Sequence, residues 1–161
     1  MSVERARAYL AKFGQADRII TFPTSSATVE LAAQAAGTEP CRIAKSMSFQ
    51  AKEGPILIVT AGDTKIDNSK FKHFFGEKAK MLPFEEVEPA IGHAVGGVCP
   101  FGVNEGVRVY LDVSLRRFPT VFPAAGEANN AIELTPAELE QYTDNQGWID
   151  VCKGWQQPAE A

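Results

Sequence analysis

The 161-residue sequence has few of the side chains that bind metals or form disulfides, with three cysteines and two histidines. Cys41, Cys99 and Cys152 lie far apart, without a CxxC pair or a histidine at ligand spacing. We therefore expect neither a disulfide framework nor a structural zinc site. The sequence also lacks an apolar run long enough for a membrane helix, and its charged first residues are not followed by one. These absences predict a cytoplasmic protein without a membrane partner.

The charge balance argues against general nucleic-acid binding. The net charge is −4, so sequence-unspecific DNA binding would need a local basic patch. The best candidate for an RNA-backbone patch is a lysine-rich segment, although such a run is usually only a solvated face. Its lysines are Lys65, Lys70, Lys72, Lys78 and Lys80. A Walker A loop and a GxGxxG fingerprint after a strand are both missing, so a nucleotide cofactor is not indicated.

Helices and strands are expected in mixed order, which predicts a single α+β domain over residues 1–155, followed by a tail at 156–161. Amphipathic stripes, caps and stop glycines predict helices at 3–13, 85–91 and 135–142. Two more helices are predicted with alternative first residues. One starts at Ser25, Ser26 or Thr28 and runs to Gly37, and the other starts at Asp67, Asn68 or Ser69 and runs to Gly76. Apolar alternation predicts strands at 18–22, 41–49, 55–60, 78–82, 107–113, 120–122 and 131–134. In the third helix we expect Phe71, Phe74 and Phe75 to point inward.

Lys45 is the most informative residue of the expected strand at 41–49. Strand alternation places it on one face with Cys41, Ile43, Met47 and Phe49, where it is the only charge. A charge on an apolar face is costly unless something pairs with it. Two interpretations are about equally supported. Lys45 is either a gatekeeper on an edge strand or a group that binds an anionic or carbonyl ligand.

The loop Gly96-Gly97-Val98-Cys99-Pro100-Phe101-Gly102 has three glycines and a proline within seven residues. Glycines let a backbone approach a ligand closely and direct its N–H groups at an oxygen. A tight turn explains the same composition and is the favoured interpretation of this stretch alone.

Other side chains give weaker signals. Cys99 has no committed histidine partner, because the spacing of His73 and His93 favours neither, and a free cysteine is usually a small buried apolar residue. His93 either borders a pocket or is a surface or capping residue. Asp112, on a strand of apolar alternation, either pairs with a cation or orients a turn.

Six segments together resemble the YbaK-type editing domains, which are related to the insertion domain of bacterial prolyl-tRNA synthetase. They are Ile43-Ala44-Lys45-Ser46-Met47-Ser48-Phe49, the apolar strand 56–60, the loop 96–102, Val109-Tyr110-Leu111-Asp112, Ala125-Gly126 and the segment 132–139. The resemblance covers roughly residues 28–152. The lysine strand and the GGxxPxG loop, in that order and with a helix between them, are specific together and weak apart.

The resemblance implies a mixed, curved, barrel-like sheet covered by helices. It also implies a deacylase that acts in trans on the ester of mischarged tRNA, most often proline tRNA. A synthetase or an elongation factor is a further expected partner. The family's reaction is thought to use no side-chain nucleophile, metal or cofactor; a terminal ribose hydroxyl and a positioned water are implicated instead. An editing site is needed because a binding pocket alone rejects smaller or isosteric amino acids weakly.

The resemblance also implies roles for particular residues. Lys45 is expected to hold the terminal adenosine, and the backbone N–H groups around Gly97 are expected to bind the substrate carbonyl. Asp112 matches an acidic position whose role is less defined. The expected substrate-binding residues are Gly96, Val98, Cys99, Pro100, Phe101, Gly102, Ile43, Ser46, Met47, Asp112 and Asn129, with Thr24 as a further polar candidate.

The turn Glu127-Ala128-Asn129-Asn130 departs from the glycine- or basic-rich turn of many family members. Asn129 or Asn130 either lines the pocket or only turns the chain, so the amino acid removed stays open. A non-hydrolytic module that binds an aminoacyl or nucleotide end is the main alternative function. A lysine Schiff-base enzyme is less supported, because nothing marks a carbonyl substrate or an acid–base partner.

Overall fold

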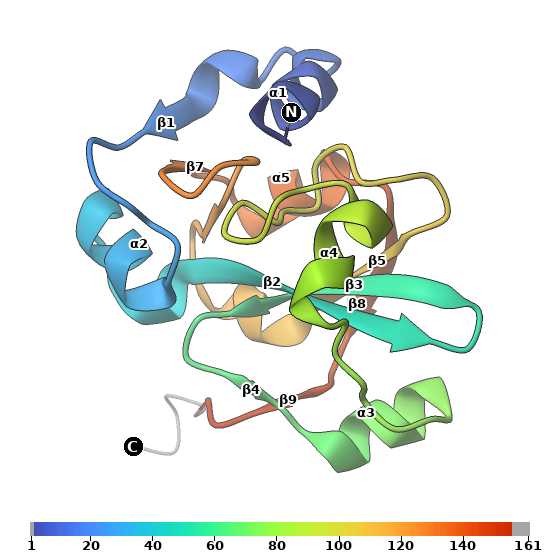
Figure 1. The fold of residues 1–161 in the computed structure, drawn as a ribbon. Helices are drawn as coiled ribbons and strands as arrows, with labels where there is room; N and C mark the ends of the chain where they lie inside the picture. The colour runs from blue at the N-terminus through green and yellow to red at the C-terminus, as the bar shows by residue number, and fades with distance from the viewer. Residues whose placement is uncertain (1, 156–161) are drawn as a thin grey trace.

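The computed structural model describes residues 2–155, so the expected tail at 156–161 lies outside the described residues. Its centre is a mixed five-stranded sheet in the order β6-β2-β3-β5-β8 (Figure 1). The strands are β2 (Ile43–Ala51), β3 (Gly54–Ala61), β5 (Arg108–Asp112), β6 (Phe122–Pro123) and β8 (Asn145–Ile149). The β2–β3 hairpin is antiparallel, whereas β6 joins β2, β5 joins β3 and β8 joins β5 in parallel. The predicted α+β fold with a mixed, curved sheet is confirmed.

The central strand β3 is buried on both sides because both of its faces are apolar. Leu57 and Val59 pack on one side of the sheet, and Ile56 and Ile58 pack on the other. This is why 55–60 reads as a continuous apolar run rather than an alternating one.

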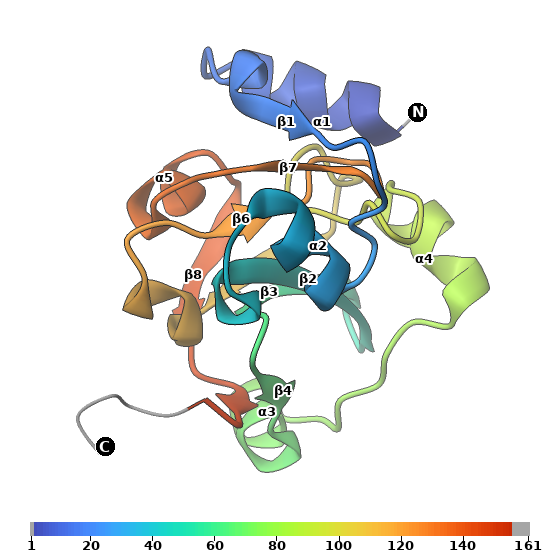
Figure 2. The same ribbon diagram turned by 90° about the vertical axis from the view of Figure 1, so that its left-hand side faces the viewer.

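Within the described residues, five α-helices cover the sheet: α1 (Ser2–Ala11), α2 (Val29–Ala36), α3 (Asn68–Phe75), α4 (Phe84–Ile91) and α5 (Pro136–Gln141). The helix α3 lies on one side of the sheet, together with the short strand pair β4 (Lys65–Ile66) and β9 (Cys152–Lys153) (Figures 1 and 2). The helix α1 lies on the other side, together with the strand pair β1 (Ile19–Thr21) and β7 (Asn130–Ile132). Three 3₁₀ turns complete the described chain, at Ala16–Arg18, Pro40–Arg42 and Val113–Arg117.

The helix ends follow the expected capping chemistry. Thr28 caps α2 by accepting from the Leu31 N–H, and Asp67 caps α3 in the same way. The Thr135 and Glu138 side chains form the predicted capping box of α5. Stop glycines at 37, 76 and 92 take left-handed conformations, which cost glycine little.

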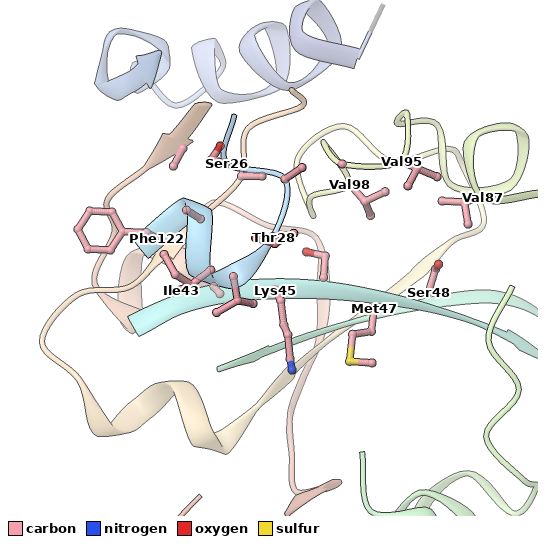
Figure 3. A pocket seen from close by; sticks show the side chains of 18 of the residues that line it. Ser26, Thr28, Ile43, Lys45, Met47, Ser48, Val87, Val95, Val98 and Phe122 are labelled. Atoms are coloured by element: carbon pink, nitrogen blue, oxygen red, sulfur yellow. The ribbon is translucent and has the colours of Figure 1, made fainter. Parts of the chain in front are cut away.

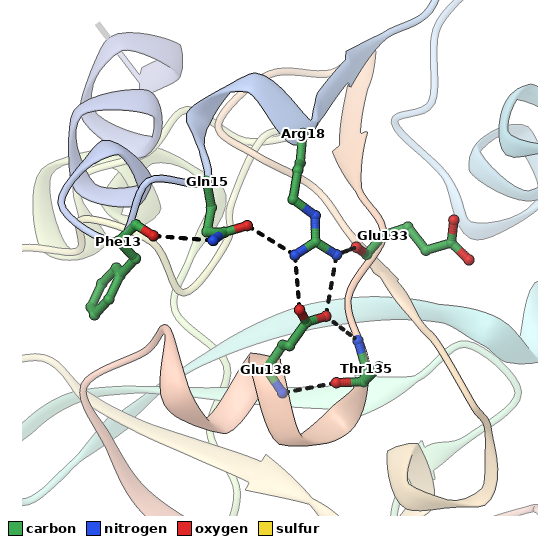
Figure 4. Close-up of polar contacts among 6 residues, drawn as sticks. All are labelled: Phe13, Gln15, Arg18, Glu133, Thr135 and Glu138. Atoms are coloured by element: carbon green, nitrogen blue, oxygen red, sulfur yellow. Dashed lines mark hydrogen bonds and ion pairs between the residues drawn. The ribbon is translucent and has the colours of Figure 1, made fainter.

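The N-terminal segment is held to α5 by a polar cluster around Arg18 (Figure 4). The Arg18 guanidinium donates to Glu138 Oε2 at 2.9 Å and to the Glu133 carbonyl at 2.7 Å. Glu138 also accepts from the Thr135 N–H, so one carboxylate serves both the capping box and the ion pair. The pair is partly exposed, which limits its contribution to stability.

Two local predictions are wrong. The segment 78–82 is not a strand, since only a single bridge joins Met81 to Phe49. Phe74 does not point inward but is 51% exposed, because Phe71 and Phe75 already fill the space between α3 and the sheet.

The strand β8 was not predicted from the sequence. Its residues Asn145-Gln146-Gly147-Trp148-Ile149 have little apolar character except at the end of the strand.

Candidate functional site

A cavity of about 400 Å³ lies between β2, the start of α2, α4 and the loop that follows α4. Its walls come from six separate segments of the chain, at 26–32, 43–48, 81–87, 95–98, 122–124 and 130–131. The lining residues are Ser26, Ala27, Thr28, Val29, Ala32, Ile43, Ala44, Lys45, Ser46, Met47, Ser48, Met81, Leu82, Phe84, Val87, Val95, Gly96, Val98, Phe122, Ala124, Asn130 and Ala131. Most of them are apolar, and the polar side chains are hydroxyls, one amide and one lysine.

Strand alternation in β2 decides which side chains face this cavity. Lys45 and Met47 point to one side of β2, whereas Ser48 points to the other, toward Val95 and Val98 (Figure 3). Ser46 shares the side of Ser48 by the same alternation. The Ser46 Oγ is buried and has no hydrogen-bond partner within residues 2–155. An unpartnered buried hydroxyl in a cavity wall is a candidate contact for a ligand.

The Lys45 ammonium therefore lies away from the cavity. Its Nζ donates to the Thr64 carbonyl at 2.5 Å, which connects β2 to the turn after β3. Burial lowers the pKa of Lys45, and the nearby Cys152 and Asp63 partly oppose that shift. In this structure Lys45 contributes its backbone and the base of its side chain to the cavity wall, and its charge to the opposite side of the sheet.

The glycine loop meets the cavity through Gly96 and Val98. Gly96 has φ +97°, a conformation that suits glycine. Gly97 is a glycine for a different reason, because a Cβ there would lie 2.5 Å from the backbone carbon of Gly126. Its N–H donates to the Ala94 carbonyl at 2.9 Å, so the expected substrate-binding donor is engaged within the loop.

The second half of the loop packs into the core instead of lining the cavity. Cys99 and Phe101 are fully buried, and Pro100 and Gly102 border a separate groove beside α1. The His93 Nε2 lies 2.7 Å from the Phe101 carbonyl oxygen and 3.6 Å from the Cys99 Sγ. Burial raises the pKa of the Cys99 thiol to about 12 and lowers the pKa of His93. Such a thiol is a poor nucleophile at neutral pH.

Asn130, not Asn129, lines the cavity. The buried Asn130 Oδ1 accepts from the Ala125 N–H at 3.0 Å and from the Glu127 N–H at 3.3 Å, and its Nδ2 donates to the Ala125 carbonyl at 3.0 Å. It thereby fixes the turn against which Gly97 packs. The Asn129 side chain instead donates from its Nδ2 to the Phe22 carbonyl at 3.3 Å, and the Asn129 carbonyl accepts from the Phe22 N–H at 2.7 Å.

Asp112 is a structural residue in the core and does not line the cavity. Its carboxylate is fully buried and accepts from the Ser114 and Val151 N–H groups, each at 2.9 Å. Of the two interpretations of Asp112, the one in which it orients a turn agrees with this geometry.

The structure brings together Ile43, Lys45, Ser46, Met47, Gly96 and Val98 at the cavity. It does not bring Gly97, Cys99, Pro100, Phe101, Gly102, Asp112 or Asn129 to that wall. The exposed Thr24 lies outside it too, and the polar wall residues that precede α2 are Ser26 and Thr28 instead. The capping pattern of Ser25, Ser26 and Thr28 was the available signal for that wall. It marked a helix start and not a cavity.

Within residues 2–155, no group of three or more His, Cys, Asp or Glu side chains could hold a metal ion. In the same part of the chain, no helix has the length and apolar character needed to cross a membrane.

The comparisons with known proteins agree with one another. A family model described as "Aminoacyl-tRNA editing domain" matches residues 24–142, which include every residue of the cavity wall. The uncharacterized protein YwhH of Bacillus subtilis (strain 168) is 52% identical over 157 residues, which cover 97% of this chain and 100% of that protein.

Two further relatives are a long ligase, of which this chain matches one part, and a solved structure that it matches over nearly the whole length. The proline–tRNA ligase of Bacillus pumilus (strain SAFR-032) is 28% identical over 111 residues, covering 66% of this chain and 20% of the ligase. A solved structure described as "Crystal structure of a putative trans-editing enzyme for prolyl tRNA synthetase" superposes with a TM-score of 0.85 at 32% identity, covering 95% of this chain and 98% of that one.

Proposed function

Because the chain belongs to the family of aminoacyl-tRNA editing domains, we propose that it hydrolyses the ester bond of a tRNA charged with the wrong amino acid. We further propose that it acts in trans and that proline tRNA is its substrate. The similarity to proline–tRNA ligases and to the trans-editing structure supports this choice. Hydrolysis would provide a second selection step, which removes wrong amino acids that the binding pocket of a synthetase fails to reject.

The observation that carries the proposal is the chemistry of the cavity wall. An unpartnered Ser46 hydroxyl lies in a largely apolar wall, next to a loop whose Gly96 and Val98 backbone also borders the cavity. No aspartate or glutamate is present among the described residues of that wall, and the Lys45 ammonium is directed away from it. Such a site suits the ester of an amino acid whose side chain is uncharged.

In the proposed reaction, a water oxygen attacks the ester carbonyl carbon and the bond from that carbon to the ribose oxygen breaks. The ribose oxygen takes one proton of the water, the other proton passes to solvent, and the amino acid leaves as a carboxylate. The Gly97 N–H is already bound to Ala94, so we assign the carbonyl oxygen to the N–H groups of Gly96 and Val98. A good donor of this kind contributes roughly 3 to 4 kcal/mol in the transition state.

The role of Ser46 follows from its position. Its hydroxyl can donate to the ester or accept from the α-ammonium, and either bond would satisfy a group that is buried without a partner. We place Lys45 in the site as a positioning residue, because its bond to the Thr64 carbonyl holds the strand that carries Ser46.

The test is a deacylation assay on proline tRNAs charged with alanine, cysteine, serine and proline. We expect multiple-turnover hydrolysis of one noncognate ester, with prolyl-tRNA spared. Ser46→Ala should lower kcat/KM about tenfold, consistent with the loss of a hydrogen bond worth about 1 to 1.5 kcal/mol. The matched control is Ser25→Ala, which changes an exposed serine outside the cavity wall. Tight binding of the charged tRNAs without turnover would instead indicate the non-hydrolytic module.

A further inference from the structure

The mouth of the cavity carries exposed apolar side chains. Phe84 is 74% exposed, Met81 is 56% exposed and Val95 is 45% exposed, and all three line the cavity. We call these three residues the apolar rim. Phe84 is the most exposed of the large apolar side chains within residues 2–155. A large aromatic ring left in water beside a binding cavity is a candidate contact surface.

Two of the three rim residues, Met81 and Phe84, are attached to the sheet and to α4, whereas Val95 lies in the loop that follows α4. Met81 is bridged to Phe49 of β2, and the neighbouring Leu82 N–H donates to the Ser48 carbonyl at 3.2 Å. Phe84 begins α4, which is fixed to the core by the buried residues Val87 and Ile91.

The ring of Phe84 also has a free face. Within residues 2–155 no aromatic ring stacks on Phe84, whereas Phe74, the other strongly exposed phenylalanine, contacts Phe75 and Tyr110. Phe84 is therefore exposed at the cavity without a stacked ring, whereas Phe74 is exposed away from the cavity and packs against two rings.

We propose that Phe84 is a stacking platform for an unpaired base at the 3′ end of the tRNA, with Met81 and Val95 as the other apolar contacts of the rim. This inference rests on the proposed function. When the ester lies in the cavity, the terminal ribose lies at its mouth and the unpaired nucleotides must pass over the rim. Bases of single-stranded nucleic acid stack on aromatic side chains without needing a particular sequence.

The charges around the rim fix the side on which the phosphates run. Lys78 and Lys80 are exposed on the segment that leads to Met81, whereas Glu85 and Glu86 are exposed just after Phe84. Phosphates are attracted to the lysines and repelled by the glutamates. The backbone of the strand therefore runs on the lysine side, and the contact with Phe84 is made by a base.

The experiment measures binding to a cytidine-cytidine-adenosine trinucleotide that carries alanine through a non-hydrolysable 3′-amide. Phe84→Ala should raise Kd roughly tenfold, within the range seen for the loss of one base–aromatic stack. Phe84→Trp should keep Kd within about twofold, because tryptophan also stacks. Phe84→Leu should behave like the alanine variant, since leucine is apolar but has no ring. Phe74→Ala is the matched control and should leave Kd unchanged.

Several results would overturn the inference. It is wrong if the wild type does not bind the trinucleotide, if Phe84→Ala binds as tightly as the wild type, or if Phe84→Leu restores affinity. It is also wrong if light scattering shows a dimer that Phe84→Ala dissociates, because the rim then covers a second copy of the chain. Thermal unfolding of each variant checks the fold, and we expect little change at so exposed a position.

Failure of the inference and failure of the proposed function give different results. If the wild type hydrolyses a charged tRNA and Phe84→Ala has the same KM, the editing function stands and the stacking platform does not. If no ester is hydrolysed but the trinucleotide binds in a Phe84-dependent manner, the platform stands and the catalytic proposal does not.

Discussion

Asn130 connects the cavity wall to the glycine loop, and its removal gives the sharpest structural prediction. Replacing it with alanine deletes three hydrogen bonds to the turn at 125–127. The side chain is only 1% exposed, so water cannot readily replace those bonds. The Ala125 N–H, the Ala125 carbonyl and the Glu127 N–H would all lose a partner.

The expected loss of stability follows from these contacts. A typical net contribution is about 1 kcal/mol per hydrogen bond, and a buried group left without a partner costs about 1 to 3 kcal/mol. The turn can relax and recover part of that loss, so we expect Asn130→Ala to lower the free energy of unfolding by about 2 to 4 kcal/mol. The assay is equilibrium urea unfolding followed by fluorescence. The adjacent Asn129→Ala is the control, because it removes a single 3.3 Å bond from a half-buried side chain and should cost less than about 1 kcal/mol.

The same substitution should also affect function, since Gly97 packs against this turn. We expect kcat/KM for deacylation to fall with Asn130→Ala, even at temperatures where the variant stays folded. Equal unfolding free energies for the two asparagine variants would refute the reasoning. Full activity of folded Asn130→Ala would show that the turn does not position the loop.

Three further predictions concern other parts of the site. Gly97→Ala should lower both Tm and kcat/KM, because the added Cβ would lie 2.5 Å from the backbone carbon of Gly126. A variant with the Tm and the kcat/KM of the wild type would contradict this prediction. Lys45→Ala should lower Tm and kcat/KM together by removing the bond to the Thr64 carbonyl; lost activity at an unchanged Tm would instead support direct contact with the adenosine. Stability should fall as pH rises above about 8.5, because unfolded thiols ionise there while Cys99 and Cys152 keep folded pKa values of about 12. Urea unfolding between pH 7 and pH 10 measures this slope, and a double Cys→Ala variant should flatten it.

Most of the fold could be predicted from local patterns. The Thr135 box, the Asp67 cap and the stop glycines each act within a few residues, so the sequence alone indicates where the helices begin and end. The misplaced elements depend on distant partners. Met81 pairs at one point with β2, and β8 is a strand because β5 offers it a free edge. Neither partner can be seen in the segment itself.

The candidate site was predicted in part. Gly96, Val98 and Ser46 line the cavity, and their predicted role in substrate binding stays a prediction. The direction of Lys45 could not be derived, because alternation shows which residues share a face of β2 and not which face borders a cavity. Gly97 is required by the close approach of the turn at 126, and such a contact between segments far apart in sequence leaves no local signal.

The cavity walls span residues 26 to 131, and this has a consequence for how the protein folds. In the part of the chain that the structure describes, only the β2–β3 hairpin joins strands that are adjacent in the chain, whereas the pairings of β3 with β5 and of β2 with β6 close long loops. Non-local strand pairing slows folding, because loop entropy is lost before the contacts form. A nascent chain emerging from the ribosome can therefore form the hairpin early, but it has no complete cavity until β6 and Asn130 have been synthesised.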